Sequence, residues 1–145
     1  MNKKRKSMCC IILASGLLFL WGCSSNDAEP SPYEEVNTLE NVKIGLEKDE
    51  YDPEGDTFIL NTVNESEDDI SYGIAFTLEK EEDNTWFMVE PDEEMAFILI
   101  AHILGPGEEA QEELNMEYYE PLDTGKYRVV REIESEVLTA EFDVN

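Results

Sequence analysis

Cysteine and histidine are nearly absent from most of this 145-residue sequence. The cysteines are Cys9, Cys10 and Cys23, all near the N-terminus, and His102 is the single histidine. A chain without cysteine after position 23 cannot form internal disulfides, thiol nucleophiles or cysteine-based zinc sites in that part. The folded part must therefore be held by packing alone, and its length suits one domain.

Basic residues are also scarce, and they are unevenly placed. The sequence has 10 lysine and arginine residues against 35 aspartate and glutamate residues, and four of the ten are Lys3, Lys4, Arg5 and Lys6. Without residues 1–22, six basic residues face 35 acidic ones, a formal charge of −29. Such a charge excludes nucleic acid as a natural partner and repels an anionic lipid surface.

Near the N-terminus, the apolar run is too short for a stable membrane span. Residues 8–20 form an apolar stretch of 13 residues, whereas a bilayer core about 30 Å thick needs roughly 20 in a helix. A basic start followed by a short apolar core is typical of an export signal. We therefore predict that residues 1–22 are a signal peptide and not part of the fold.

The end of this segment carries a short motif. Leu20, Gly22 and Cys23 have the spacing Leu-x-Gly-Cys, which resembles the lipobox of bacterial lipoproteins. The resemblance implies cleavage before Cys23 and attachment of lipid, a diacylglyceryl group and palmitate, to the mature N-terminal cysteine. The protein would then be anchored to the cell membrane on its outer, extracytoplasmic face. An ordinary secretory cleavage and an uncleaved anchor are the alternatives.

A polar stretch follows the cysteine. Residues 24–37 contain proline and almost no apolar side chain, a composition that cannot pack into a core. We predict that residues 23–40 comprise the lipidated cysteine and a disordered tether, and that residues 41–145 form the folded domain.

Short alternating apolar and polar runs, separated by turn-forming residues, dominate the remainder. They lie at residues 41–47, 57–63, 70–80, 84–90, 112–119, 125–133 and 137–144. In the last run, Leu138, Ala140, Phe142 and Val144 share one face. Residues 93–104 form a continuous apolar run that suits a buried strand or a short helix, and its isoleucines favour the strand. Seven to nine short strands predict an all-β protein, an antiparallel β-sandwich without a disulfide.

Several motifs along the predicted domain carry a family likeness. They are Asn64, Tyr72-Gly73, Glu79-Lys80, Trp86, Pro106-Gly107 and Gly125-Lys126-Tyr127-Arg128. In order and spacing they resemble the bacterial immunoglobulin-like domain of lipoproteins and other exported proteins of Gram-positive bacteria, over residues 42–144. The Pro-Gly turn and the late Gly-x-Tyr also resemble the Bacillus intracellular proteinase inhibitor family. Immunoglobulin-like members generally have no assigned activity, so the resemblance implies a fold and an extracytoplasmic location.

Individual residues of these motifs suit a sandwich. Tyr127, five residues after Leu122, resembles a tyrosine corner, in which the hydroxyl bonds back to the preceding loop. Trp86 is expected to fill space between the sheets. Lys126 and Arg128 share a strand face, so we expect them to pair with acidic residues on neighbouring strands.

No catalytic constellation is evident. His102 has no serine in a Gly-x-Ser-x-Gly setting to activate, and one histidine among scattered carboxylates does not suggest zinc. Carboxylates are so abundant that an acid pair for sugar hydrolysis carries no information. Gly105-Pro106-Gly107 lacks the lysine and helix of a phosphate-binding loop, so it indicates a turn. We therefore expect no enzyme activity, no cofactor and no small-molecule substrate.

One acidic turn invites a calcium interpretation. Asp52, Glu54 and Asp56 supply oxygen ligands of the kind that calcium prefers. Their spacing is not that of an EF-hand loop, and a charge run is usually a solvated face. No metal site is therefore assigned, and these three residues remain weak calcium candidates.

Together these features predict a lipid-anchored surface module without catalysis, which binds an unknown protein or envelope component. The membrane is reached through the lipid on Cys23. The alternative is a proteinase inhibitor that offers a strand-connecting loop to a protease.

Overall fold

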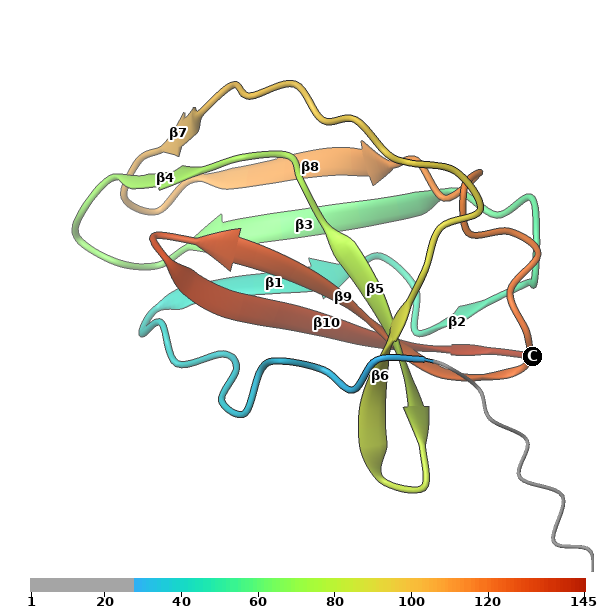
Figure 1. Cartoon of the computed structure of the whole chain (residues 1–145). Coiled ribbons are helices and arrows are strands. Elements are labelled where there is room, and N and C mark those ends of the chain that lie inside the picture. The colour runs from blue at the N-terminus through green and yellow to red at the C-terminus, as the bar shows by residue number, and fades with distance from the viewer. Residues whose placement is uncertain (1–27) are drawn as a thin grey trace, which may run out of the picture.

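The computed structural model describes residues 28–145, which contain ten β-strands and no helix (Figure 1). The strands are β1 (Val42–Leu46), β2 (Glu50–Tyr51), β3 (Phe58–Asn64), β4 (Ile70–Tyr72), β5 (Thr77–Glu82), β6 (Thr85–Val89), β7 (His102–Leu104), β8 (Glu109–Leu114), β9 (Gly125–Ile133) and β10 (Glu136–Val144). This part of the chain therefore has no helix long and apolar enough to cross a membrane. The predicted signal peptide and Cys23 lie outside the described residues.

The strands form two sheets of a sandwich. The smaller sheet has the order β1-β3-β8, and the larger has the order β2-β10-β9-β4-β7, with β5 pairing with β9 and carrying β6. All pairs are antiparallel except β2 with β10. The predicted β-sandwich is confirmed, with ten strands in place of seven to nine.

One additional strand arises because the predicted run 70–80 is divided. β4 ends at Tyr72 and β5 begins at Thr77, and both pair with β9. Between them the backbone leaves the ladder, and the Ile74 carbonyl accepts a hydrogen bond of 2.9 Å from Nη2 of Arg131. A side chain of the neighbouring strand thus contacts the break, which alternation within the run does not reveal.

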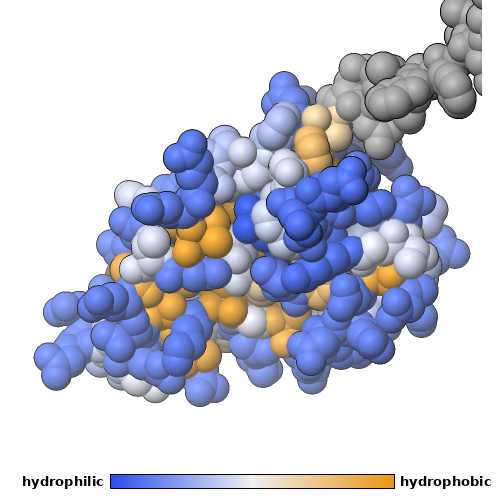
Figure 2. All heavy atoms as spheres, turned by 90° about the horizontal axis from the view of Figure 1, so that it is seen from below, coloured by the Kyte–Doolittle hydropathy of each residue, from blue (hydrophilic) through white to orange (hydrophobic). Residues whose placement is uncertain are grey.

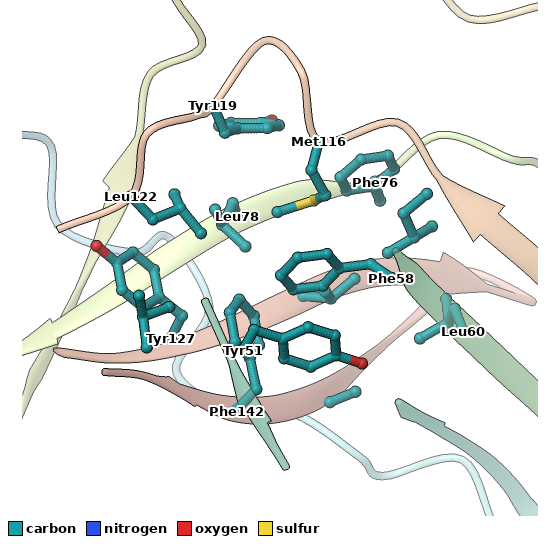
Figure 3. Close-up of a cluster of buried hydrophobic side chains, with 14 residues drawn as sticks. Tyr51, Phe58, Leu60, Phe76, Leu78, Met116, Tyr119, Leu122, Tyr127 and Phe142 are labelled. Atoms are coloured by element: carbon teal, nitrogen blue, oxygen red, sulfur yellow. The ribbon is translucent and has the colours of Figure 1, made fainter. Parts of the chain in front are cut away.

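Aromatic rings fill the centre of the main core (Figure 3). The ring of Tyr51 stacks on Phe58 with centroids 3.8 Å apart, and Phe142 meets both edge-on at 5.5 and 5.2 Å. Such pairs contribute about 0.5–1.5 kcal/mol beyond the burial of their area. The predicted shared face of β10 is buried as expected, at Leu138, Ala140, Phe142 and Val144.

The predicted tyrosine corner is present. The hydroxyl of Tyr127 donates a hydrogen bond of 2.8 Å to the carbonyl of Asp123, which fixes the loop before β9. Burial raises the pKa of Tyr127 to about 12. The corner thus ties the loop that enters β9 to the aromatic core, where Tyr127 stacks on Phe142 at 5.5 Å.

Trp86 does not fill the space between the sheets, so that prediction is wrong. The residue lies on β6, at the hairpin with β5, and it is outside both buried clusters. Its ring instead lies 4.4 Å from Cζ of Arg128 and 5.9 Å from Nζ of Lys126. The indole therefore covers cations on the outer face of the sheet, where its ring attracts positive charge.

The first described residues pair with the sandwich, which differs from the disordered tether expected for residues 23–40. The N–H of Ser31 donates to the Trp86 carbonyl and the N–H of Met88 donates to the Glu29 carbonyl, both at 2.8 Å. Further along, the side chain of Asn37 bonds Thr139 on β10. Main-chain pairing at a sheet edge requires no apolar side chains, so composition does not forbid it.

The apolar run 93–104 is neither one strand nor a helix. Only His102–Leu104 forms a strand, β7, which pairs with β4 at the end of the larger sheet. The residues before it form a long irregular connection, which leaves β6 and runs along one side of the molecule to β7 in Figure 1. The favoured strand interpretation therefore holds for the last three residues only.

Candidate functional site

The connection between β6 and β7 exposes a group of large apolar side chains. Leu99 is 100% exposed, Ile98 66%, Ile100 55% and Ile103 on β7 73%. Exposed aliphatic residues that are adjacent in this way mark interaction sites more often than scattered ones do. For comparison, the face shown in Figure 2 is mostly hydrophilic, with apolar residues in small separate patches.

Three cavities adjoin along this connection, and Phe97 lines all of them. Their volumes are about 450, 210 and 510 Å³. The first two also share Phe76 and Thr77, and the last two share Ala75 and Glu132. Because these cavities share lining residues, we call the three together the Phe97 groove.

Aromatic rings form the apolar part of the groove. The ring centroid of Phe76 lies 5.7 Å from that of Phe97 and 6.1 Å from that of Tyr119. Burial, with a smaller contribution from the nearby Glu90 carboxylate, raises the pKa of Tyr119. Tyr33, from the docked N-terminal segment, lines the central cavity. Four separate parts of the chain thus contribute to this aromatic surface.

The charged lining of the groove has one sign. Its acidic residues are Glu90, Glu93, Glu94, Glu132 and Glu134. No lysine, arginine or histidine is among the described residues that line the three cavities. The groove therefore combines aromatic and aliphatic surface with negative charge that no basic lining residue balances.

The cations of the described chain are all engaged elsewhere. Each of its six lysine and arginine residues forms an ion pair with an acidic residue outside the groove lining. One pair is buried on both sides, Arg128 with Glu79 at 2.6 Å, and in another the buried Arg131 pairs with the half-buried Glu112 at 2.7 Å. The expected pairing of Lys126 and Arg128 with cross-strand acids is confirmed, the former with Glu141 at 2.6 Å.

The two buried arginines lie on opposite faces of β9. Arg131 points between the sheets and binds both oxygens of Glu112 from the smaller sheet. Arg128 points outward, beneath Trp86 and the Ser31 hydroxyl. Within residues 28–145, one oxygen of Glu79 and Nε of Arg131 have no hydrogen-bond partner. No residue of the two pairs lines the Phe97 groove, although Arg131 bonds the carbonyl of Ile74, which does line it.

The histidine and serine considered as catalytic candidates do not form a common site. His102 is exposed on β7, with its ring centroid 5.7 Å from that of Tyr72. Ser66 uses its hydroxyl within the loop that follows β3, where it donates to Asn64 Oδ1. No structural feature brings these two together. The Gly105-Pro106-Gly107 turn connects β7 and β8 as predicted.

Of the weak calcium candidates, Asp52 and Glu54 are exposed, and the Asp56 carboxylate has partners within the chain. Asp56 forms an ion pair of 2.8 Å with Lys48, and it accepts a hydrogen bond from the N–H of Asp52. The Lys48 ammonium, followed by that N–H, lowers the pKa of Asp56. In the part of the chain that the structure describes, no three histidine, cysteine or acidic residues cluster to hold a metal ion.

Sequence reasoning did not find the Phe97 groove. Its signal was the apolar run 93–104, which we interpreted as a buried segment because continuous apolar residues usually are. Glu90 before this run, and Glu93 and Glu94 at its start, are the only hint in the sequence that it borders solvent. The contributions of Tyr33 and Glu132 come from distant parts of the chain and left no local pattern.

Comparisons with curated proteins and with solved structures find only partial likenesses. A comparison with curated proteins finds no match. Among solved structures, an alkylpurine DNA glycosylase AlkC of Pseudomonas fluorescens, bound to DNA containing an abasic site analogue, is 15% identical, with a TM-score of 0.41. A β-glucosidase from Listeria innocua in complex with gluconolactone is 16% identical, with a TM-score of 0.36. Each likeness covers 72% of this chain, but only 30% and 16% of those chains.

The family assignment rests on a different comparison. The profile of the bacterial Ig-like domain matches residues 38–143, close to the range over which the sequence motifs resemble such a domain. The match covers most of the chain and the sandwich from β1 to all but the last residue of β10. The chain belongs to the bacterial Ig-like domain family.

Proposed function

We propose that this protein is a non-catalytic binding module, held by a lipid on Cys23 at the outer face of the cell membrane, which docks a partner on the Phe97 groove. The observation that carries the binding role is the exposure of Leu99 and its neighbours beside that groove. A stable water-exposed domain has no structural need for such a segment, because burying it would lower the free energy.

The anchor is supported by the sequence. The basic start, the short apolar core and Leu20-x-Gly22-Cys23 stand in the order that lipid attachment requires. A domain of charge −29, from six basic and 35 acidic residues, has no electrostatic attraction to an anionic membrane. The lipid therefore supplies the attachment, and two acyl chains suffice for stable anchoring.

Membrane fractionation of producing cells tests the anchor. We expect Cys23→Ser to release the protein to the medium or to leave an unprocessed precursor, while the parent protein stays in the membrane fraction. Cys10→Ser is the matched control, because that residue lies within the predicted signal peptide. Unchanged fractionation and unchanged mass of the Cys23→Ser protein would refute lipid anchoring.

Site-specific cross-linking on intact cells tests the binding role. A photo-reactive amino acid in place of Leu99 is expected to capture a discrete partner, whereas the same group in place of Glu67, an exposed residue outside the groove, is not. Equal labelling patterns from both positions would contradict the role of the groove. If the captured partner is a secreted protease whose activity the domain inhibits, the proteinase inhibitor alternative replaces ours.

A further inference from the structure

The groove has properties that define its ligand more closely than the binding role alone. Resting on the proposed function, we propose that the Phe97 groove binds a cationic, amphipathic polypeptide segment, in which lysine or arginine residues are interspersed with apolar ones. The occupant is thus a basic protein or peptide segment, and neither a lipid surface nor a second copy of this chain.

The exposed apolar segment beside the groove calls for apolar groups in the ligand. Leu99 and Ile98 are water-exposed beside cavities whose floor includes Phe76 and Phe97. A ligand without apolar side chains would leave this surface in contact with water. Its affinity would then lack the contribution from burial of apolar surface, which is the main one. The ligand must therefore carry aliphatic or aromatic groups.

The glutamates that line the groove favour a positively charged ligand. Glu90, Glu93 and Glu94 line one end of the groove and Glu132 and Glu134 the other. Since every lysine and arginine within residues 28–145 forms an ion pair elsewhere, none of these residues neutralises the groove carboxylates. A ligand of positive charge satisfies them, and it is also steered toward a domain of strong negative charge.

The aromatic rings of the groove can contact both the apolar and the basic parts of such a ligand. Phe76, Phe97 and Tyr119 lie within 5.7–6.1 Å of one another in successive pairs, at the end lined by Glu90, Glu93 and Glu94. Ring faces attract ammonium and guanidinium groups, and they also pack against the methylene stems of lysine and arginine. A single basic side chain can therefore contact ring and carboxylate together, which a small inorganic cation cannot do.

The other apolar occupants are opposed by charge. A second copy of the chain would bring the same glutamates and the same excess of negative charge to the contact. An anionic membrane would meet Glu132 and Glu134 beside Leu99, and like charges repel. A basic polypeptide is the partner class that gains from both the apolar and the acidic surface.

Peptide binding to the lipidated protein in non-ionic detergent micelles tests this proposal. The probes are three fluorescent ten-residue peptides, of alternating lysine and leucine, glutamate and leucine, and lysine and serine. We expect the lysine–leucine peptide to bind at least tenfold more tightly than either of the others, by fluorescence anisotropy. Its affinity should fall several-fold between 50 and 300 mM salt, because screening weakens the charge contacts.

Two variants and a matched control locate the site. Leu99→Ser and Glu132→Lys are each expected to weaken the lysine–leucine peptide at least fivefold. Glu67→Lys, the same charge reversal at an exposed residue outside the groove, should change the affinity less than twofold. Equal effects of the two charge reversals would overturn the proposal, because binding would then reflect net charge alone.

Three further outcomes would overturn the cationic ligand, and a fourth would count against the proposed function. Failure of all three peptides to bind, while position 99 still captures a partner in cells, would overturn the cationic ligand and leave the binding role standing. Binding of phosphatidylglycerol vesicles to the released Cys23→Ser protein, lost in Leu99→Ser, would overturn it in favour of a membrane contact. Self-association that Leu99→Ser abolishes would overturn it in favour of a second copy. Peptide binding without any partner captured in cells would instead count against the proposed function.

Discussion

The interface between the sheets and the Phe97 groove treat the same kinds of polar group in opposite ways. Between the sheets, Arg131 and Glu112 neutralise one another, and Asn64 and Tyr127 have hydrogen-bond partners within the chain. In the groove, five glutamates face solvent with no basic residue beside them. The difference teaches that abundance of acid does not mark a site in this protein. What marks the groove is acid without a basic partner next to exposed apolar side chains, because most of the 35 acidic residues lack a cation.

The largest effect is expected from breaking the pair between the sheets. Arg131→Met should lower the free energy of unfolding by about 3–5 kcal/mol, because it leaves Glu112 without its bidentate partner and frees the Ile74 carbonyl. Denaturant titration measures the loss. The double variant with Glu112→Met should recover much of it, and a double variant as unstable as the single one would contradict this account.

A smaller loss is expected at Asn64, which is fully buried. Its side-chain amide donates to the carbonyls of Asp68, Leu104 and Gly105, at 2.8–3.0 Å, and so joins the loops after β3 and β7. Asn64→Ala should cost about 2–4 kcal/mol, since the buried Leu104 carbonyl loses its donor and two partly buried carbonyls lose a contact. Thermal unfolding measures it, and the half-buried Asn61→Ala, which removes the bond from Gln111, serves as the control with a cost under about 1 kcal/mol.

The tyrosine corner gives a pH-dependent test of the interface between the sheets, where polar groups have partners within the chain. Because the folded pKa of Tyr127 is raised to about 12, the folded state holds this proton more tightly than the unfolded state does. The stabilisation is complete below a pH of about 10, the usual tyrosine pKa, and it is lost as the pH rises toward 12.

Tyr127→Phe should cost about 1 kcal/mol near neutral pH, through loss of the bond to Asp123, and it should flatten the alkaline decline. Denaturant titrations from pH 8 to 11 measure both. A residual slope is expected from Tyr51, Tyr72 and Tyr119, whose pKa values burial also raises. An unchanged alkaline slope in the variant would contradict the role of Tyr127.

The smallest effect on stability is expected in the groove. Reversing two charges there, with Glu93→Lys and Glu94→Lys together, should change the free energy of unfolding by less than about 0.5 kcal/mol, because both side chains are exposed. The same variant should nevertheless lose the lysine–leucine peptide. A loss of stability comparable to that of Arg131→Met would show that the groove glutamates have structural partners, and the contrast between the two regions would fail.

Parts of the fold could be predicted because local pattern and tertiary role agree. β9 and β10 coincide with the predicted runs to within a residue, since each alternates between the core and the outer face. Lys126 and Arg128 pair with acids as expected, because parity alone fixes their face.

Other parts depend on distant residues and left no local signal. The break at Ile74 is contacted by Arg131, from another strand, and the docked segment at Ser31 uses main-chain groups that any residue possesses. Trp86 was misplaced because size suggested a core position, whereas the cation of Arg128 holds it outside. Phe97 and its neighbours looked like core because hydropathy does not record whether an apolar run is covered.

The pairing of Glu29 and Ser31 with β6 fixes how many residues separate Cys23 from the folded domain. If Cys23 carries the lipid, the six residue steps from there to Glu29 can span at most about 20 Å, at roughly 3.3–3.6 Å each. That is shorter than the contour of about 60 Å that a free tether to residue 40 would allow. The domain would thus stand close to the bilayer with its β5–β6 hairpin beside the attachment point. The connection that carries Leu99 starts at β6 and runs away from that hairpin to β7 (Figure 1). The end of the groove that Met88 and Val89 of β6 line would then lie near the attachment point.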